Sequence, residues 1–150
     1  MIVRFATPAD YDQWRPLWDG YNEFYGRSGA TALPDEITQT TWQRFFDPAE
    51  PLYCLVAEQD DRLAGLAHYL FHRSMIAIEP VCYLQDLFTA PATRGQGVGR
   101  ALIERVYAEA QGANSSRVYW HTYESNKTAQ ALYDKLAERP PVLFYKKQLI

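Results

Sequence analysis

Aromatic residues in the first third of the chain recur with the spacing of a helix. Residues 2–5 are predicted to form a strand, and Thr7-Pro8-Ala9-Asp10 then supplies a capping hydroxyl, an early proline and a carboxylate, all typical of a helix start. Pro16 lies inside this helix and predicts a kink or a restart. The aromatic residues lie at three- and four-residue steps on one helix face, namely Tyr11, Trp14, Trp18, Tyr21 and Tyr25.

Short apolar runs separated by turn residues predict the other elements. A loop of small residues at 26–32 precedes a second helix, and Gln59-Asp60-Asp61 is the expected turn of a hairpin. In chain order we expect a helix at about 34–46, strands at 52–58, 62–73 and 81–89, a helix from about 97, a strand from 117, a helix containing Leu132 and a strand at 142–145.

One loop carries glycine at every second position. The strand at 81–89 is followed by Gly95, Gly97 and Gly99, and a helix is expected to open at about Gly97. Because glycine has no Cβ, the N–H groups of residues 95–100 are able to converge on phosphate oxygens. The helix N-terminus adds unpaired N–H groups and a positive dipole end. The pattern predicts a pyrophosphate-binding loop, although a tight turn without a ligand has the same spacing.

Spacing separates the phosphate-binding loops that this pattern resembles. A nucleoside-triphosphate loop requires a lysine, and none lies near this loop. The dinucleotide fingerprint requires Gly-x-Gly-x-x-Gly, whereas the glycines here run Gly95-x-Gly97-x-Gly99. The remaining pattern, Arg94-x-x-Gly97-x-Gly99, resembles the acetyl-CoA loop of the GCN5-related N-acetyltransferases (GNAT).

A second block strengthens this resemblance. Asn126 follows a predicted strand, and Leu132-Tyr133 lies on the next helix with Tyr133 seven residues after Asn126, which is the spacing of the family's other diagnostic block. Two motifs in the family's order are more specific than either alone. Residues 83–88 and 118–120 are most similar to the branch that holds small polyamine, D-amino-acid and histone acetyltransferases.

The resemblance implies both a fold and a cofactor. It implies one N-acetyltransferase domain over residues 1–150 with an α/β (α+β) GNAT fold, in which about four helices flank a mixed, mostly antiparallel sheet of about six to seven strands. It implies acetyl-CoA as co-substrate and no metal. The residues expected to bind the cofactor are Leu87, Phe88, Thr89, Arg94, Gly95, Gln96, Gly97, Val98, Gly99, Arg100, Asn126 and Tyr133.

Acetyl transfer to an amine sets three chemical requirements. An amine of pKa near ~10 is protonated at neutral pH, so a base must take its proton. Asp86 is the favoured base, Glu124 and His121 are alternatives, and a carboxylate that is simply solvated is also compatible with the pattern. The resemblance implies the N–H near Leu87 as donor to the carbonyl oxygen and Tyr133 as acid for the departing thiolate. A buried core tyrosine would explain the position of Tyr133 nearly as well.

The identity of the acceptor amine stays open at this point. In the resembling family the first two helices roof the acceptor site, so Tyr21, Tyr25 and Glu124 are candidate substrate-binding residues, although an aromatic stripe more often forms core. We expect a small-molecule amine, a polyamine or an amino-acid-like compound, with a protein amino group as a further option. A non-catalytic acyl-CoA-binding module on the same fold is the alternative from another class.

Composition narrows the function classes. Apolar residues make up 47% of 150 residues, which is enough for one domain with a core, and no apolar run is long enough for a membrane span, so we expect a cytoplasmic protein. A net charge of −3 with scattered basic residues argues against nucleic-acid binding. His68 and His72 lie about 13 Å apart on a strand and do not form a metal site. Cys54 and Cys82 lie in strand-like runs, which disfavours a cysteine nucleophile.

The C-terminal end departs from the family pattern. Many members have a glycine and an aromatic residue before the last strand, where this chain has Pro140-Pro141. Prolines donate no ladder hydrogen bonds, so we expect an edge or a bulge there. Phe144 and Tyr145 beyond them belong either to a core or to a dimer surface, and we expect a homodimer.

Overall fold

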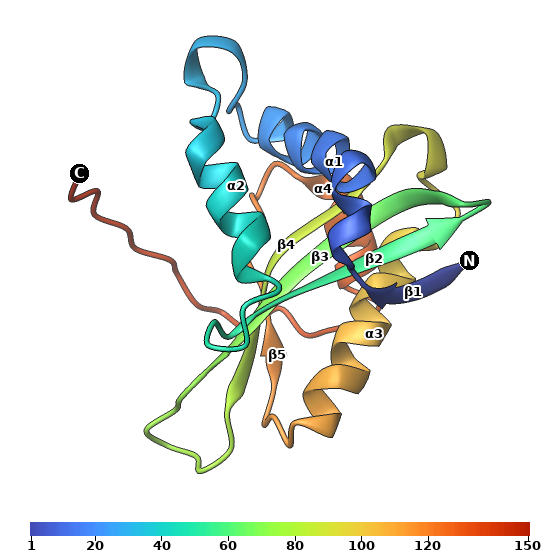
Figure 1. The fold of residues 1–150 in the computed structure, drawn as a ribbon. Coiled ribbons are helices and arrows are strands. Elements are labelled where there is room, and N and C mark those ends of the chain that lie inside the picture. Colours follow the sequence, from blue (N-terminus) through green and yellow to red (C-terminus); the bar gives the residue numbers. More distant parts are fainter. The chain divides into compact units, whose positions relative to one another are not determined.

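A computed structural model describes residues 1–150 (Figure 1). The chain forms two compact units, Met1–Trp120 and His121–Ile150. The elements of the first unit are β1 (Ile2–Phe5), α1 (Tyr11–Phe24), α2 (Asp35–Arg44), β2 (Leu52–Gln59), β3 (Arg62–His72), β4 (Val81–Thr89), α3 (Val98–Gly112) and β5 (Val118–Tyr119). The second unit contains α4 (Lys127–Tyr133). Single 3-10 turns cover Pro8–Asp10, Gly29–Thr31 and Pro91–Thr93.

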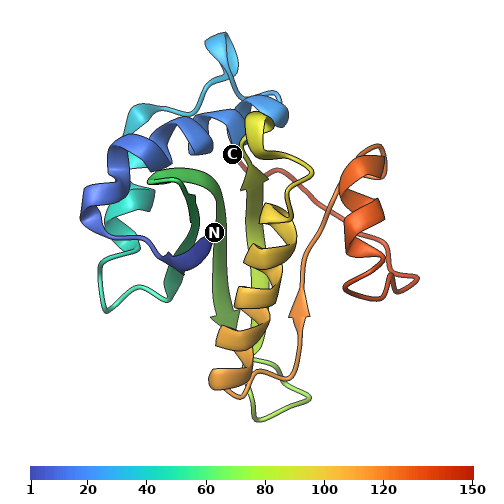
Figure 2. The same cartoon turned by 90° about the vertical axis from the view of Figure 1, so that its right-hand side faces the viewer.

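The strands form one mixed sheet in the order β1-β2-β3-β4-β5. The first three neighbouring pairs are antiparallel, and β4 pairs with β5 in parallel. Within this unit α1 and α2 lie against one face of the sheet and α3 against the other (Figure 2). The predicted α+β fold is confirmed.

Aromatic side chains of α1 are among the largest in the core on the α1 face. Trp14 is fully buried, and its ring lies 5.8 Å from that of Trp18 in a stacked arrangement and 4.6 Å from that of Trp42 on α2. These rings belong to one buried cluster with apolar side chains of β2 and β3 such as Val56 and Leu66. Burial of one such side chain stabilises the fold by roughly 1.5–3 kcal/mol. The face predicted from the three- and four-residue spacing therefore anchors α1 to the sheet.

The start of α1 is held by an ion pair. Asp10 accepts two hydrogen bonds from the guanidinium of Arg4, at 2.7 and 2.9 Å, and another from the backbone N–H of Thr7 at 2.7 Å. The helix then runs through Pro16 without a break, so the predicted restart is wrong. Pro16 lies on the exposed side of the helix, where water is able to serve the carbonyl that the proline leaves unpaired.

The sheet has five strands, fewer than the six to seven expected, because residues 142–145 form no strand. Pro140 and Pro141 have no N–H to donate, and the N–H of Val142 donates to the carbonyl of Pro140 at 2.9 Å in a tight local turn. Phe144 and Tyr145 are 70% and 87% exposed, so neither is a core residue. The chain has no helix that is both long and apolar enough to cross a membrane.

Candidate functional site

A β-bulge in β4 aims the side chain of Asp86. Tyr69 of β3 is opposite Leu84 and His68 is opposite Asp86, so Gln85 is an extra residue with no partner. Residues directly opposite each other share a face of the sheet, and neighbours along a strand alternate. His68 faces α1 and Tyr69 faces α3, so the bulge places Asp86 on the α1 face while Leu84 stays on the α3 face. Without the extra residue, Asp86 and Leu84 would lie on the same face.

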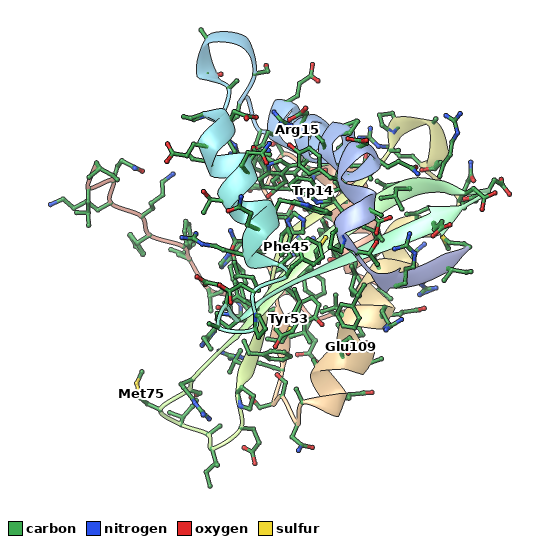
Figure 3. All side chains as sticks on the ribbon, in the orientation of Figure 1. Trp14, Arg15, Phe45, Tyr53, Met75 and Glu109 are labelled. Atoms are coloured by element: carbon green, nitrogen blue, oxygen red, sulfur yellow. The ribbon has the colours of Figure 1, made fainter.

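Asp86 is held there by a buried chain of hydrogen bonds. Nε1 of Trp14 donates to Nε2 of His68 at 3.1 Å, and Nδ1 of His68 lies 2.9 Å from Oδ2 of Asp86. Figure 3 shows Trp14 beneath α1, pointing toward the sheet. The indole N–H only donates, so Nε2 accepts and the imidazole proton lies on Nδ1. His68 therefore donates to Asp86, and both imidazole nitrogens are occupied.

Tyr21 is the second partner of Asp86. Burial raises the pKa of the Tyr21 hydroxyl, and the charge of Asp86 together with a hydrogen bond between the two side chains raises it further. The phenol thus stays protonated and donates to the carboxylate. Tyr25 lies one turn later with its ring 4.9 Å from that of Tyr21. The structure therefore brings together three residues selected from the sequence, namely Asp86, Tyr21 and Tyr25.

Beyond Tyr83, β4 has a partner strand on one side only. Its pairing with β5 covers Cys82↔Val118 and Tyr83↔Tyr119 and then ends, while its pairing with β3 continues to Thr89. Successive N–H groups of a strand point to opposite sides. The N–H of Ala90 donates toward β3, to the carbonyl of Ala64 at 2.8 Å, so by alternation the N–H of Leu87 points to the side that has no strand. That N–H is available to a ligand oxygen.

The glycine loop has the geometry of an anion-binding loop. Gly95 and Gly97 have φ of 77° and 83°, in the left-handed region that favours glycine, and Gly97 is the N-cap of α3 as predicted. The N–H of Ala101 is the first to bond back within the helix, to the carbonyl of Gly97 at 3.0 Å. The N–H groups of Val98, Gly99 and Arg100 thus lie in the unpaired first turn.

Open space lies beside the same glycines, and a cation flanks them. A Cβ added at Gly95 or Gly97 would meet no atom within 4 Å, so a ligand can approach the backbone closely. The guanidinium of Arg94 lies 5.8 Å from the ring centre of Phe88, and Gln96 accepts a hydrogen bond from Gln59 at 3.2 Å. The loop therefore has the open space and the unpaired N–H groups that an anionic group requires.

The remaining predicted residues belong to the second unit. Asn126 is the N-cap of α4, where its side chain accepts from the N–H of Ala129 at 3.4 Å. Tyr133 is the last residue of α4 and is half-buried. Glu124 and His121 are exposed, and neither lies in a strand. Their expected roles stay predictions.

Two further features of the first unit are its cysteines and a hollow. Cys54 and Cys82 are buried, and burial raises the pKa of both thiols, that of Cys82 to about 11, which is the reverse of an activated nucleophile. A hollow of about 310 Å³ contains none of the groups of the first unit described above and is lined by Tyr53, Phe71, His72, Arg73, Pro80 and Ala113.

Comparison with known proteins identifies the family. The family model described as "Acetyltransferase (GNAT) family" matches residues 14–137. The chain belongs to the GNAT family. It is an N-acetyltransferase, and the family implies acetyl-CoA as its co-substrate.

Several relatives of this GNAT chain are named as acetyltransferases. It is 37% identical over 150 residues to the D-amino-acid N-acetyltransferase HPA3 of Saccharomyces cerevisiae, covering 98% of this chain and 90% of that one. It is 32% identical over 95 residues to the thialysine N-epsilon-acetyltransferase of Sus scrofa, covering 58% and 55%. The crystal structure of a probable acetyltransferase, 25% identical, superimposes with a TM-score of 0.84 over 100% of this chain and 97% of that one.

Sequence reasoning about the GNAT site missed Trp14 and His68. The sequence pattern raises His68 only as a possible metal ligand together with His72, and Trp14 only as a member of the aromatic stripe. The alternation of β3 carried a partial signal, because His68 falls on the same face as Leu66 and is therefore a polar residue at a core position. Such a residue requires buried partners, and Trp14 and Asp86 supply them.

Proposed function

We propose that this protein transfers the acetyl group of acetyl-CoA directly to the primary amine of a small molecule, a polyamine or an amino-acid-like compound. The observation that carries the proposal is the buried carboxylate of Asp86, oriented by His68 and Tyr21 on the strand whose next residues have an unpaired side. A carboxylate there attracts an ammonium group and is able to take a proton from it.

Asp86 is the proton acceptor that the hydrogen bonds favour. Nε2 of His68 is occupied by the indole N–H and Nδ1 by Asp86, so this imidazole has no free lone pair for a substrate. The carboxylate accepts one bond from His68 and one from Tyr21, and its oxygens have about four acceptor sites in all. The remaining sites serve the amine.

Other groups of this chain stabilise the charge that forms on the acyl donor. Acetyl-CoA supplies a thioester, whose C–S bond breaks as the amine nitrogen bonds to the carbonyl carbon. The N–H of Leu87 donates to the carbonyl oxygen as negative charge develops on it. Residues 94–100 bind the pyrophosphate through their N–H groups and the N-terminus of α3, with Phe88 and Thr89 leading into that loop.

Tyr133 is the proposed acid for the departing thiolate, and Asn126 the proposed contact to the cofactor. Both assignments rest on their spacing in the family's second block. The ammonium loses two protons as it becomes an amide: the first passes to Asp86 and from there to water, and the second leaves the nitrogen after it has bonded to the carbonyl carbon. That second proton replaces the one that Tyr133 gives to the thiolate of CoA, so one proton in all is released to solvent. Glu124 stays a candidate for binding the substrate.

The names of the relatives support an amine acceptor. The yeast relative is named for D-amino acids and the pig relative for thialysine, and both kinds of compound carry a primary amine. The buried thiols of Cys54 and Cys82 support direct transfer over an acyl-cysteine route, because a protonated thiol is a poor nucleophile.

Release of free CoA thiol in the presence of a panel of amines tests the proposed function. The panel contains polyamines, D- and L-amino acids, an aminoglycoside and a lysine-containing peptide, each mixed with acetyl-CoA and protein. We expect thiol release above the amine-free rate with at least one small amine, together with the acetylated amine in the mass spectrum. Thiol release that is the same with and without every amine would contradict the proposal.

A homodimer is the proposed assembly. The segment from Val142 to Tyr145 exposes four consecutive apolar side chains, 70–87% accessible, which is consistent with a subunit contact. Sedimentation equilibrium tests it, and the mass of a monomer at micromolar concentration would contradict it.

A further inference from the structure

Arg27 presents a fixed positive charge at the end of α1. Its Nε donates to Oδ1 of Asn22 at 2.7 Å, and its backbone N–H donates to the carbonyl of the same residue at 2.8 Å. Asn22 is itself 4% exposed and donates from Nδ2 to the carbonyl of Trp18 at 2.9 Å. A buried amide therefore orients the guanidinium through its inner nitrogen, and the two terminal nitrogens extend beyond this anchor.

The guanidinium lies over two aromatic rings of the candidate site. Its central carbon is 5.8 Å from the ring centre of Tyr21 and 5.5 Å from that of Tyr25. Arg15 on the same helix pairs with Asp19 and Asp35, whereas Arg27 forms no ion pair with a carboxylate of the chain. The guanidinium is thus oriented by uncharged side chains, and its charge is available to an anion.

Tyr21 connects this cation to Asp86. The Tyr21 hydroxyl is bonded to the Asp86 carboxylate, and the positive charge of Arg27 acts on the same hydroxyl. The Asp86 carboxylate and the Arg27 guanidinium, which are of opposite charge, therefore both lie beside Tyr21, a side chain that is 8% exposed. A ligand with an ammonium and a carboxylate on one carbon matches this arrangement. A polyamine does not, because its second ammonium would lie near Arg27.

We propose that Arg27 binds the carboxylate of the acceptor, which makes the acceptor an α-amino acid whose amine is held at Asp86. The planar guanidinium suits a carboxylate in bidentate geometry, and such charge-assisted bonds are about twice as strong as neutral ones. This assignment rests on the proposed acetyl transfer, and it selects the amino acid over the polyamine at the same site.

Paired acceptors test the assignment. Each pair consists of an amino acid and the amine that remains when its carboxylate is removed: D- or L-phenylalanine against phenethylamine, and D- or L-lysine against cadaverine. For Arg27→Gln we expect the KM for the amino acid of the preferred enantiomer to rise roughly 10–100-fold with little change in kcat, and the KM for the matching amine to stay nearly constant. Arg27→Lys keeps the charge and should fall between wild type and Arg27→Gln.

Two controls separate the outcomes. Arg44→Gln removes a half-exposed arginine of α2 whose ion pair with Glu50 is 3.7 Å long. This variant should change the KM neither for the amino acid nor for the matching amine. Melting temperatures show that each variant is folded. Equal KM changes for amino acid and amine, or none for the amino acid, would overturn the role of Arg27 while leaving acetyl transfer intact. A wild-type protein that acetylates polyamines but no amino acid of any pair would also overturn the role of Arg27, and one that acetylates no amine of the wider panel would overturn both.

Discussion

His68 donates a hydrogen bond from Nδ1 to Oδ2 of Asp86 over 2.9 Å, with both side chains almost fully buried. The direction of this bond is set on the far side of the imidazole, where Trp14 donates to Nε2. A buried residue of α1 thereby determines that the imidazole nitrogen facing the proposed base, Nδ1, carries the proton. His68 and Trp14 are positioning residues, because neither is expected to touch the substrate.

Trp14→Phe tests this positioning. The substitution keeps an aromatic ring but removes the N–H, so Nε2 of His68 loses its buried donor, at a cost of about 1–3 kcal/mol in the free energy of unfolding. It also removes the constraint on the imidazole proton. We expect kcat for acetylation to fall roughly 10–100-fold while the affinity for CoA is kept, as measured by steady-state kinetics and calorimetric titration.

Trp18→Phe is the matched control for that variant. Trp18 lies on the same helix and its Nε1 donates to the hydroxyl of Thr38 at 3.2 Å, so the substitution also removes one buried indole hydrogen bond. It should lower stability by a similar amount and leave kcat nearly unchanged. Equal losses of kcat in the two variants would show that Trp14 acts only through packing.

Gly97→Ala tests the phosphate-binding loop. Gly97 has φ of 83°, and a side chain there meets no atom but strains the backbone by roughly 1–2 kcal/mol. Relief of that strain would turn the N–H groups of the loop away from one another. We expect the affinity for CoA, measured by calorimetric titration, to fall at least about tenfold, because each lost charge-assisted bond contributes ~1.5–3 kcal/mol.

Gly29→Ala supplies the comparison for the loop. Gly29 also has a positive φ, 55°, and open space around it, but it lies in the loop before α2. The Gly29→Ala protein should be less stable than wild type but bind CoA with the same affinity. An unchanged affinity in Gly97→Ala would contradict the assignment of the loop.

The pH dependence of stability tests the ion pair that starts α1. The hydrogen bonds from Arg4 lower the pKa of Asp10 to about 2, from an ordinary value of 3.8. Because the folded pKa is the lower one, the stabilisation is fully present above about pH 4 and is lost as pH falls toward 2. We expect Asp10→Asn to be less stable than wild type by on the order of 1–2 kcal/mol at pH 5, with the gap closing near pH 2 in urea unfolding.

Asp35→Asn serves as the control for Asp10. Asp35 pairs with Arg15 but its side chain is 66% exposed, so its substitution should change stability little at any pH. A gap between wild type and Asp10→Asn that stays constant from pH 5 to pH 2 would be inconsistent with the lowered pKa.

The element order was predictable because periodicity marks it locally. The aromatic steps of α1, the hairpin around Asp60 and the glycines before α3 each lie within one short stretch of chain. The absence of a strand at 142–145 was not predictable in this way. The apolar run there favours a strand, whereas the prolines at 140 and 141 favour a turn, and the structure has the turn at Val142.

The candidate site was predictable only in part. Asp86 and the glycine loop can be selected from the residues next to them in the sequence, whereas the residues that bond to Asp86 are far from it along the chain. His68 is 18 residues from it along the chain, and Trp14 a further 54. The bulge at Gln85 was also not predictable from alternation. Leu84 and Asp86, before and after it in the chain, are both buried, as they would be in a regular strand, although they lie on opposite faces of the sheet.

Tyr133→Phe tests the proposed acid. The variant keeps the ring and loses one hydroxyl, so it should lower kcat by roughly 10²–10⁴-fold and change the melting temperature and the affinity for CoA little. Tyr123→Phe, at an exposed tyrosine of the same unit, should retain full turnover. Full turnover in Tyr133→Phe with a reduced melting temperature would identify a core tyrosine instead.

The central claim is that the Asp86 carboxylate takes the proton of the acceptor amine, and kcat of Asp86→Asn tests it most directly. Asparagine has the same shape and is still able to accept from His68, so the buried chain of hydrogen bonds is kept while the base is lost. The account predicts a kcat lower by roughly 10²–10⁴-fold with unchanged CoA affinity and melting temperature. Turnover within a few-fold of wild type in a folded, CoA-binding Asp86→Asn protein would contradict it.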